Sequence, residues 1–553
     1  MDSRFRDAVD AFQRGDLGTA LAIATKELDS SGPGWQHLLG LIECRRGNIA
    51  AGVDHLRAAS EAVPDNDSFR LMLARALVDL GAEAEVIAMP EPDGPASPAN
   101  LALWHVRAEA AQKLDDAAAA AKAWRAITAI APPDHRAWIN LGRSLLRLDL
   151  LSEAAEAYAR ALAIAPEDAA AIHELALLLE RMNEIDRIAV LLESSAAAGI
   201  AKERLPFAWA LLEQRRGNTE EAQRLLAMPG ADRERIHWYR LAARVEDMLG
   251  NSAEAFAAAA AMNRSVPDFG PWRRRAGDYR ERLRGLADAI STEWPAELPT
   301  LPPAEISPAF IVGFPRSGTT LLDTFLMGHR EIEVLEELPL LADVSQALGP
   351  LEKLPSARRD ALESAREQYL RKLAAALPVQ PGTVVIDKFP LNMLWAPLIH
   401  SLFAASPIIF VQRHPCDAVL SGFMQSFVLN IANSNFLDLA DAADFYDACM
   451  TVWTASCAKL TLNVRTVRYE DLVADPEATL RPVIEELALD WDERMLDHRA
   501  TAKRRGPIAN TSYNQVTEPL SAAPVLRWRR YEKELAPVLP VLLPWAERLG
   551  YPT

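Results

Sequence analysis

The chain has 553 residues and a formal net charge of −17 at pH 7. Its length calls for more than one domain, and its negative charge argues against general nucleic-acid binding. Half of the residues are hydrophobic and 24% are charged, which is typical of a soluble globular protein.

No apolar run is long enough to span a bilayer, and the first residues are typical of an amphipathic helix rather than a signal peptide. The four cysteines and ten histidines show none of the spacings of metal ligands. We therefore expect reduced thiols, a cytoplasmic location, and no structural or catalytic metal.

Residues 1–285 are rich in alanine and leucine and contain no segment typical of a strand. In the clearest unit, residues 135–168, Trp138, Gly142 and Pro166 stand at the offsets of the tetratricopeptide repeat (TPR), a helix pair of about 34 residues. Weaker matches lie on both sides, so the segment resembles an array of about eight units. This pattern predicts an α-solenoid of TPR helix pairs over residues 1–285.

The concave face of such an array offers an extended surface for a protein or peptide partner. The alternative is a spacer or a platform for a homodimer, and the sequence leaves both open. Residues 286–306 follow as a proline-rich stretch that interrupts the helical pattern. We predict a semi-stiff linker there and a second domain over residues 307–553.

The second domain alternates short β-branched runs with long helical stretches, which predicts an α/β fold with a parallel sheet and helices on both faces. The predicted strands are 309–313, 383–387, 408–412 and 464–469. Ligands of such sheets bind at the carboxyl ends of the strands. The polar residues that follow the strands, Arg316, Lys388 and Arg413, are therefore candidates for a binding site.

The first predicted strand runs into a loop with the GxxxxG spacing of a nucleotide P-loop, from Gly313 to Gly318. Thr319 stands where the P-loop lysine would be, and the cation is instead Arg316, whose planar fork suits phosphate or sulfate oxygens. A helical pattern follows Thr320, which brings a positive helix N-terminus to the same point. The segment predicts a P-loop-like anion site without the lysine of an ATPase.

Two further groups are ambiguous when taken alone. Arg413 and Ser421, on the following helix, could hold a second phosphate, or Arg413 could form an ion pair with Asp417 that holds the turn. Lys388 could reach the strand-end crevice, although an isolated lysine is more often a surface residue.

Taken together, the motifs of the second domain resemble the sulfotransferase family, in particular TPR-linked bacterial enzymes related to the tyrosylprotein sulfotransferases. The resemblance covers about residues 307–545. The segments that carry it, in chain order, are GFPRSGTTLL, LEELPLL, DKFPLN, VQRHPCDAVLS, RYEDLVADP, SYNQVTEPL and RWRRY.

The resemblance implies that the sulfuryl donor is 3′-phosphoadenosine 5′-phosphosulfate (PAPS), with adenosine 3′,5′-bisphosphate as the product. It implies a catalytic base at Glu337, with Lys388 and Ser512 steadying the developing charge. The donor-binding residues that it implies are Pro315, Arg316, Ser317, Gly318, Thr319, Thr320, Arg413, Ser421 and Arg527. The TPR array would then recruit an acceptor protein, peptide or glycan, or another partner.

Sulfuryl transfer is an in-line displacement that depends on positioning and charge stabilisation. Because a sulfuryl group carries less negative charge than a phosphoryl group, side-chain cations suffice and Mg²⁺ is dispensable. Glu337 would act as general base, with Glu336 as the rival carboxylate.

The sequence departs from the tyrosylprotein enzymes at Pro339 and Gln425, where those enzymes have arginines that grip acidic peptides. The acceptor therefore stays open between a protein tyrosine, a saccharide and another hydroxyl compound. Two other functions remain as alternatives: a P-loop kinase, which Thr319 disfavours, and a non-catalytic TPR scaffold, which the retained set of charged residues disfavours.

Overall fold

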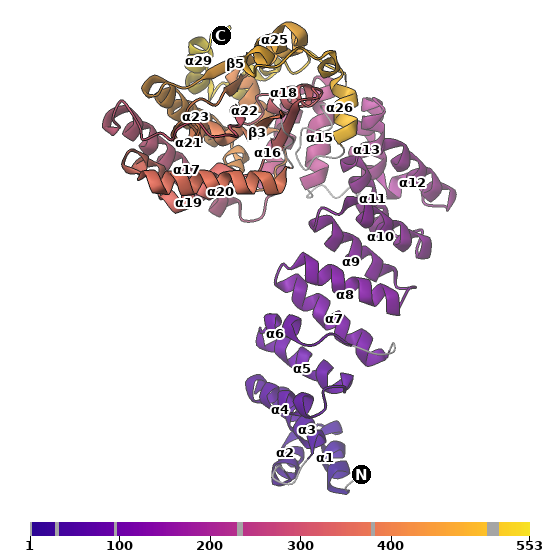
Figure 1. The fold of residues 1–553 in the computed structure, drawn as a ribbon. Helices are drawn as coiled ribbons and strands as arrows, with labels where there is room; N and C mark the ends of the chain where they lie inside the picture. The colour runs from indigo at the N-terminus through magenta and orange to yellow at the C-terminus, as the bar shows by residue number, and fades with distance from the viewer. Residues whose placement is uncertain (1–2, 28–31, 93–96, 229–235, 378–381, 506–518) are drawn as a thin grey trace. The chain divides into compact units, whose positions relative to one another are not determined.

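The computed structural model describes residues 3–27, 32–92, 97–228, 236–377, 382–505 and 519–553 (Figure 1). The chain divides into two compact units, Met1–Leu212 and Glu213–Thr553. In the described ranges, no helix combines the length and the apolar character that a membrane span requires.

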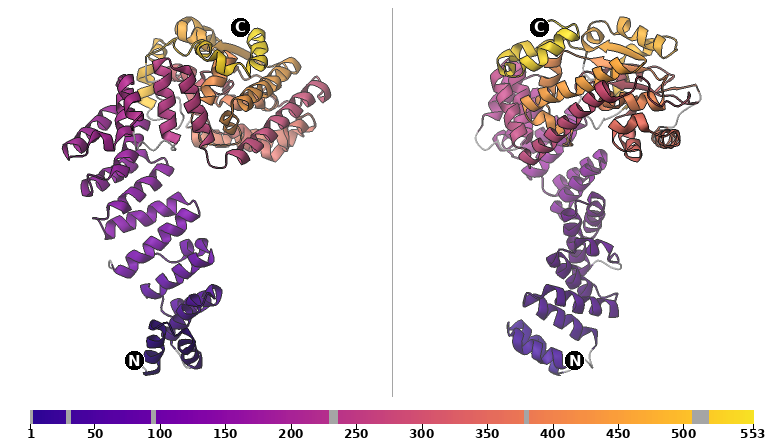
Figure 2. Two further views of the ribbon diagram at one scale, coloured as in Figure 1. Left: turned by 180° about the vertical axis from the view of Figure 1, so that it is seen from behind. Right: turned by 90° about the vertical axis from the view of Figure 1, so that its left-hand side faces the viewer.

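The first unit is built of consecutive helices that pack as antiparallel pairs (Figure 2). This arrangement confirms the predicted TPR-like helical array. The helices are α1 (Ser3–Gln13), α2 (Leu17–Lys26), α3 (Pro33–Arg45), α4 (Ile49–Ala62), α5 (Asp67–Leu80), α6 (Glu83–Ala88), α7 (Pro98–Lys113), α8 (Ala117–Ile130), α9 (His135–Arg147), α10 (Leu151–Ile164), α11 (Ala169–Arg181) and α12 (Ile185–Ala197).

Small residues and polar caps explain why this sequence folds into helix pairs. The side chain of Asp134 accepts hydrogen bonds from the main-chain N–H groups of Arg136 and Ala137 and so caps α9. Gly142 lies against the ring of Tyr158, and a Cβ at position 142 would come within 2.9 Å of that ring. The glycine thus permits the close approach of α9 and α10.

The second unit begins with helices that the sequence assigned to the repeat array. Helix α13 (Pro206–Arg215) contains the division between the units, and the helices that follow are α14 (Thr219–Leu226), α15 (Ile236–Leu249), α16 (Ser252–Arg264) and α17 (Phe269–Asp288). The helical chain continues beyond α17 as a π-helical turn, Ala289–Glu293, and Trp294, Leu298 and Leu301 are then buried. The stretch predicted as a linker is therefore partly helical and contributes to the core of the second unit.

A five-stranded parallel sheet forms the centre of the second unit, in the order β2-β3-β1-β4-β5. The strands are β1 (Ala309–Val312), β2 (Ile332–Glu336), β3 (Val384–Lys388), β4 (Ile408–Gln412) and β5 (Val464–Arg468). The predicted α/β class with a parallel sheet is confirmed. Edge strand β2 is an addition to the four predicted strands, and the alternation of glutamates with apolar residues in EIEVLEE is a signal that could have marked it.

Alternate residues of each strand enter two separate cores. Phe310 and Val312 of β1 face a core that α17, α19, α20, α21, α23 and α29 complete, whereas Ile311 faces a core with α18, α25 and α26. The sheet is therefore covered by helices on both faces. These helices are α18 (Thr319–Leu326), α19 (Leu340–Leu348), α20 (Arg359–Ala376), α21 (Ala396–Leu402), α22 (Pro415–Phe423), α23 (Leu439–Lys459), α24 (Tyr469–Ala474), α25 (Pro476–Glu486), α26 (His498–Arg505), α28 (Glu532–Leu535) and α29 (Leu539–Arg548).

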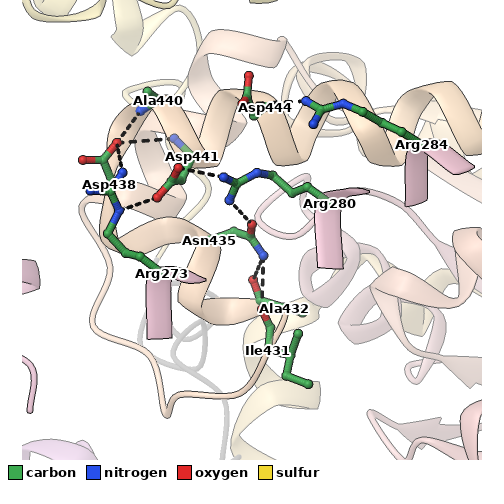
Figure 3. Close-up of polar contacts among 10 residues, drawn as sticks. All are labelled: Arg273, Arg280, Arg284, Ile431, Ala432, Asn435, Asp438, Ala440, Asp441 and Asp444. Carbon is green, nitrogen blue, oxygen red and sulfur yellow. Dashed lines mark hydrogen bonds and ion pairs between the residues drawn. The ribbon is translucent and has the colours of Figure 1, made fainter. Parts of the chain in front are cut away.

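Helix α17 is joined to α23 by a row of ion pairs (Figure 3). Arg280 is buried and donates to Asp441 Oδ1 at 2.8 Å and to Asn435 Oδ1 at 2.7 Å. Arg273 also contacts Asp441, through Nε at 2.5 Å. At the exposed end of the row, Arg284 lies 3.7 Å from Asp444.

We predict that Arg280→Met will loosen the contact between α17 and α23. Removing one partner of a buried ion pair leaves an uncompensated charge, at a cost of about 3 kcal/mol. Hydrogen–deuterium exchange of α17 and α23 should therefore accelerate by about 100-fold. Arg284→Met is the matched control, because an exposed pair contributes less than about 1 kcal/mol. Equal effects of the two substitutions would contradict the role assigned to Arg280.

Candidate functional site

A crevice of about 1410 Å³ opens at the carboxyl ends of the strands. It is lined by residues that directly follow β1, β2, β3, β4 and β5, together with residues of α15, α17 and α22. Most of the predicted site residues line it: Pro315, Arg316, Gly318, Thr319, Thr320, Glu337, Arg413, Ser421 and Arg527. Ser317 and Lys388 are buried behind its wall, and Ser512 lies outside the described residues.

The loop after β1 has the backbone of an anion-binding turn. Arg316 has φ 70° and Gly318 has φ 100°, both in the left-handed region, and α18 begins at the next residue. A Cβ at Gly318 would lie 2.4 Å from the ring of Tyr469, so only glycine fits there. The loop therefore combines left-handed backbone with a helix N-terminus, an arrangement that favours an oxyanion.

Arg316 is half-buried and lies among other guanidinium groups. Its Nε donates to Ser421 Oγ at 3.2 Å, so the residues predicted for the two phosphate groups are direct neighbours. Burial, together with the charges of Arg413 and Arg527, lowers the pKa of Arg316 to about 10, although Tyr469 and Glu337 oppose that shift. A bound anion would favour the charged form of this arginine.

Arg413 is held by main-chain oxygens and not by Asp417. Its Nη1 and Nη2 donate to the carbonyl oxygens of Arg316 and Pro524, each at 2.9 Å, and its guanidinium lies 4.6 Å from the centroid of the Tyr469 ring. Asp417 instead accepts a hydrogen bond from the main-chain N–H of Trp528 at 2.7 Å. The alternative of an Arg413–Asp417 ion pair is therefore wrong, and the charge of Arg413 is free of a carboxylate contact within the described residues.

Lys388 at the end of β3 is completely buried between two carboxylates. Its Nζ lies 2.6 Å from Glu337 Oε1 and 3.2 Å from Asp323 Oδ2. Burial alone would lower the pKa of Lys388, but the charges of Asp323 and Glu337 outweigh it and raise the pKa. The main-chain N–H of Glu337 also donates to the carbonyl of Lys388 at 2.8 Å, at a residue whose φ is 48°. The two side chains form one fixed pair.

Glu336 and Glu337 have different partners. Glu336 is bonded to Arg505 of α26, whose Nη1 also lies 2.9 Å from Asp323 Oδ1. Glu337 contacts Lys388 instead and is the more exposed of the two carboxylates, with 38% of its side chain accessible against 22%. This arrangement favours Glu337 over Glu336 as the carboxylate that can meet a ligand.

The sequence did not single out Asp323 and Arg505, which complete this network. Asp323 is fully buried inside the otherwise apolar run of α18, and a lone carboxylate within TTLLDTFLM is a signal that could have marked it. Arg505 stands at the end of a basic helix and nothing in its neighbourhood distinguishes it. Its position opposite Asp323 follows only from the fold.

Asp387 precedes Lys388 and enters the opposite face of the sheet. Its carboxylate accepts hydrogen bonds from the hydroxyl of Tyr369 at 2.7 Å and from Asn392 Nδ2 at 3.2 Å. Burial raises the pKa of Asp387 to about 7, against the opposing effect of these two donors. The residue supports the position of β3 beneath the crevice.

The raised pKa of Asp387 predicts that the difference in unfolding free energy between the wild-type chain and Asp387→Asn depends on pH. The folded chain holds the Asp387 proton more tightly than the unfolded chain, whose pKa is 3.8. The stability that Asp387 contributes is therefore complete below about pH 4 and is lost as the pH rises through about 7.

The amide of the variant does not ionise, so its unfolding free energy lacks this pH dependence. Between about pH 4 and pH 8, urea unfolding should show the wild-type chain losing about 4 kcal/mol of unfolding free energy relative to the variant. Exposed Asp490 provides the control variant Asp490→Asn. Parallel pH profiles for Asp387→Asn and the wild-type chain would refute this account of Asp387.

In the described part of the chain, no three His, Cys, Asp or Glu side chains are grouped as metal ligands. Several arginines, among them Arg316, Arg413 and Arg527, line the crevice together with the carboxylates of Asp247, Glu336 and Glu337. Lys388 lies behind Glu337. Such a site can bind a multiply charged anion and present a carboxylate beside it.

Residues 308–493 match the sequence model of the sulfotransferase family. An uncharacterized protein of Aquifex aeolicus (strain VF5) is 28% identical over 261 residues, which are 44% of this chain and 33% of that protein. Protein-tyrosine sulfotransferase 1 of Danio rerio is 23% identical over 256 residues, which are 44% of this chain and 71% of that protein. This chain therefore spans about a third of the length of the Aquifex relative.

Among solved structures, the sulfotransferase domain of the Synechococcus PCC 7002 olefin synthase is 22% identical and covers 43% of this chain and 91% of its own, with a TM-score of 0.28. The crystal structure of MamA is 18% identical and covers 32% of this chain and 97% of its own, with a TM-score of 0.24. The resemblance to the sulfotransferase family that the sequence motifs indicate is confirmed by the family match and the tyrosylprotein relatives.

Proposed function

We propose that the chain transfers a sulfuryl group from PAPS to the hydroxyl group of an acceptor and leaves adenosine 3′,5′-bisphosphate. The observation that carries this proposal is the left-handed turn at Arg316 and Gly318, which meets the start of α18 beside further guanidinium groups. The match of residues 308–493 to the sulfotransferase family supports the same conclusion.

The residues of the crevice fit a donor with two anionic groups. The loop from Pro315 to Thr320 would hold the phosphosulfate, and Arg413, Ser421 and Arg527 would hold the 3′-phosphate. Burial and the charges of Arg413 and Arg527 lower the pKa of Arg316, and anionic groups bound between these arginines would counteract both effects. Gly318 allows the loop to pack against the ring of Tyr469, which any side chain at position 318 would displace.

When bound, the donor supplies a sulfuryl group attached to a phosphate leaving group. Glu337 would accept the proton of the acceptor hydroxyl on its carboxylate, which then becomes neutral. Lys388, 2.6 Å from that carboxylate and held charged by Asp323, would then direct its positive charge toward the reacting groups. Arg316 would stabilise the charge that develops on the leaving phosphate, and Ser512 would assist it.

The acceptor would be presented by the TPR array, as a protein, a peptide or a glycan. Array folds offer extended surfaces for such partners. Near the proposed base, Pro339 and Gln425 supply no cation, so the acceptor site is less suited to an acidic peptide than that of the tyrosylprotein enzymes. In this scheme side-chain cations provide the charge stabilisation, and the reaction does not require a metal.

Calorimetry with adenosine 3′,5′-bisphosphate tests the donor class directly. The wild-type chain should bind this nucleotide without Mg²⁺ and should bind ATP much more weakly, with or without Mg²⁺, because Thr319 replaces the P-loop lysine. Arg316→Ala should weaken binding by about 100-fold, the value of a charge-assisted contact in a partly buried site.

A chain that begins at Pro206 keeps all of these residues and should bind the nucleotide like the full chain. Preferential binding of ATP with Mg²⁺ would instead favour the kinase alternative. Unchanged binding by Arg316→Ala would remove the loop from the donor site.

A pair of carboxamide substitutions identifies the base. Glu337→Gln should bind adenosine 3′,5′-bisphosphate normally and lower kcat by at least about 100-fold, the usual effect of losing a general base. Glu336→Gln is the matched control, because Glu336 is bonded to Arg505. If Glu336→Gln shows the larger loss of kcat at unchanged donor affinity, the base is Glu336 and the assignment of Glu337 is wrong.

A further inference from the structure

Asp247, in the last turn of α15, contacts the segment that carries the donor-binding residue Arg527. Arg527 Nε and Nη2 lie 3.3 Å and 3.1 Å from the two carboxylate oxygens of Asp247. Arg530 Nη2 and the hydroxyl of Tyr531 donate to the same carboxylate at 2.9 Å and 2.6 Å. One carboxylate therefore collects two guanidinium groups and a phenol on the wall of the crevice.

The stability of α15 itself does not account for an aspartate at this position. The end of a helix carries partial negative charge, so a carboxylate in the last turn is unfavourable for the helix that bears it. The benefit arises at the wall of the crevice, where Arg527 and Arg530 would otherwise repel each other, and where Arg527 also repels Arg316.

The position of α15 is fixed by its partner helix α16, which packs on the helix that carries Ser421. Asn263 of α16 is buried, and its Nδ2 donates to the carbonyl oxygens of Phe423 and Phe436 at 2.9 Å and 3.2 Å. The rings of Phe256 and Phe423 stack with centroids 4.8 Å apart. Asp247 is consequently presented from a rigid support and not from a mobile loop.

The contacts of Arg527 leave one terminal nitrogen for a ligand. Nε and Nη2 bond to Asp247, and Nη2 also lies 3.1 Å from Met424 Sδ. Nη1 makes no hydrogen bond with the residues that the structure describes. On the main chain, Leu526 has φ 53° and the N–H of Trp528 is bonded to Asp417, so both ends of the turn are also held.

We propose that Asp247 is a positioning residue for the donor: it fixes the guanidinium of Arg527 so that Nη1 faces the anionic group bound in the crevice. This inference rests on the proposed function, because the ligand is the same bisphosphate nucleotide. It also assigns part of the donor site to a helix that precedes the residues matched by the sulfotransferase family.

A double-mutant cycle on the full chain tests the inference by calorimetry with adenosine 3′,5′-bisphosphate. Asp247→Asn should raise the Kd by about tenfold, because a charge-assisted contact that orders Arg527 is lost. Arg527→Ala should raise the Kd at least as much. The double variant should match Arg527→Ala alone, because Asp247 acts through that arginine.

Asp247→Glu keeps the charge and should restore part of the affinity, which a purely structural role would not require. The control is Asp278→Asn, which removes an exposed aspartate of α17 and should leave the Kd unchanged. Thermal unfolding of each variant identifies any that fail to fold. If Asp247→Asn does not fold, Asp247→Glu replaces it in the cycle, with a smaller expected loss of nucleotide affinity.

The inference would be overturned if Asp247→Asn binds the nucleotide as tightly as the wild-type chain, or more tightly. Asp247 would then act on the nucleotide only as a nearby negative charge, or not at all. Losses that multiply in the double variant would overturn it as well. Failure of the wild-type chain to bind the nucleotide would instead refute the proposed function on which this inference rests.

Discussion

A lysine ammonium without exposed surface stays charged only if carboxylates surround it, and this requirement organises the edge of the sheet. Lys388 lies between Asp323 of α18 and Glu337, which follows β2. Asp323 in turn is shared with Arg505 of α26. The network therefore ties two strands and two helices together at the carboxyl ends of the strands, and it orients Glu337, which is more exposed than Glu336 and has Lys388 as its cationic neighbour. Burial makes each of these contacts stronger and each missing partner more costly.

A second constraint is that the unit containing the sheet begins well before the first strand. Arg280 of α17 buries its charge against Asp441, and Asn263 of α16 bonds to main-chain oxygens of the α/β region. Removing either side of such a contact would leave a buried polar or charged group of the other side without a partner. The helices before the sheet and the α/β region therefore depend on each other. Helices that resemble the end of a repeat array by sequence thus form one wall of the crevice. A boundary drawn where the helical pattern ends would cut through this wall.

Local patterns predicted the elements of the chain better than its long-range contacts. The offsets of Trp138 and Gly142 predicted helix pairs, and the apolar run before Gly313 predicted β1, because these signals lie within a few residues. Strand β2 was missed because it lacks the continuous β-branched run of the other strands, although its alternation of glutamates and apolar residues is typical of an edge strand. Asp323, Arg505 and Asp247 were missed because their roles depend on partners that are distant in sequence and adjacent only in the fold. The choice between Glu336 and Glu337 depended in the same way on which cation each one meets.

The overall charge of −17 and the cationic crevice are compatible because the two act over different distances. At physiological ionic strength, solvent screens charges beyond about 8 Å, so the acidic surface has little influence inside a partly enclosed site. Within the crevice, charges interact at short range and with less screening, and burial together with the charges of Arg413 and Arg527 lowers the pKa of Arg316. An acidic surface disfavours long polyanions such as nucleic acids, which must lie across it, whereas a small anion would contact only the crevice, where several arginines gather. The charge pattern is therefore better suited to a compact anion than to a long one.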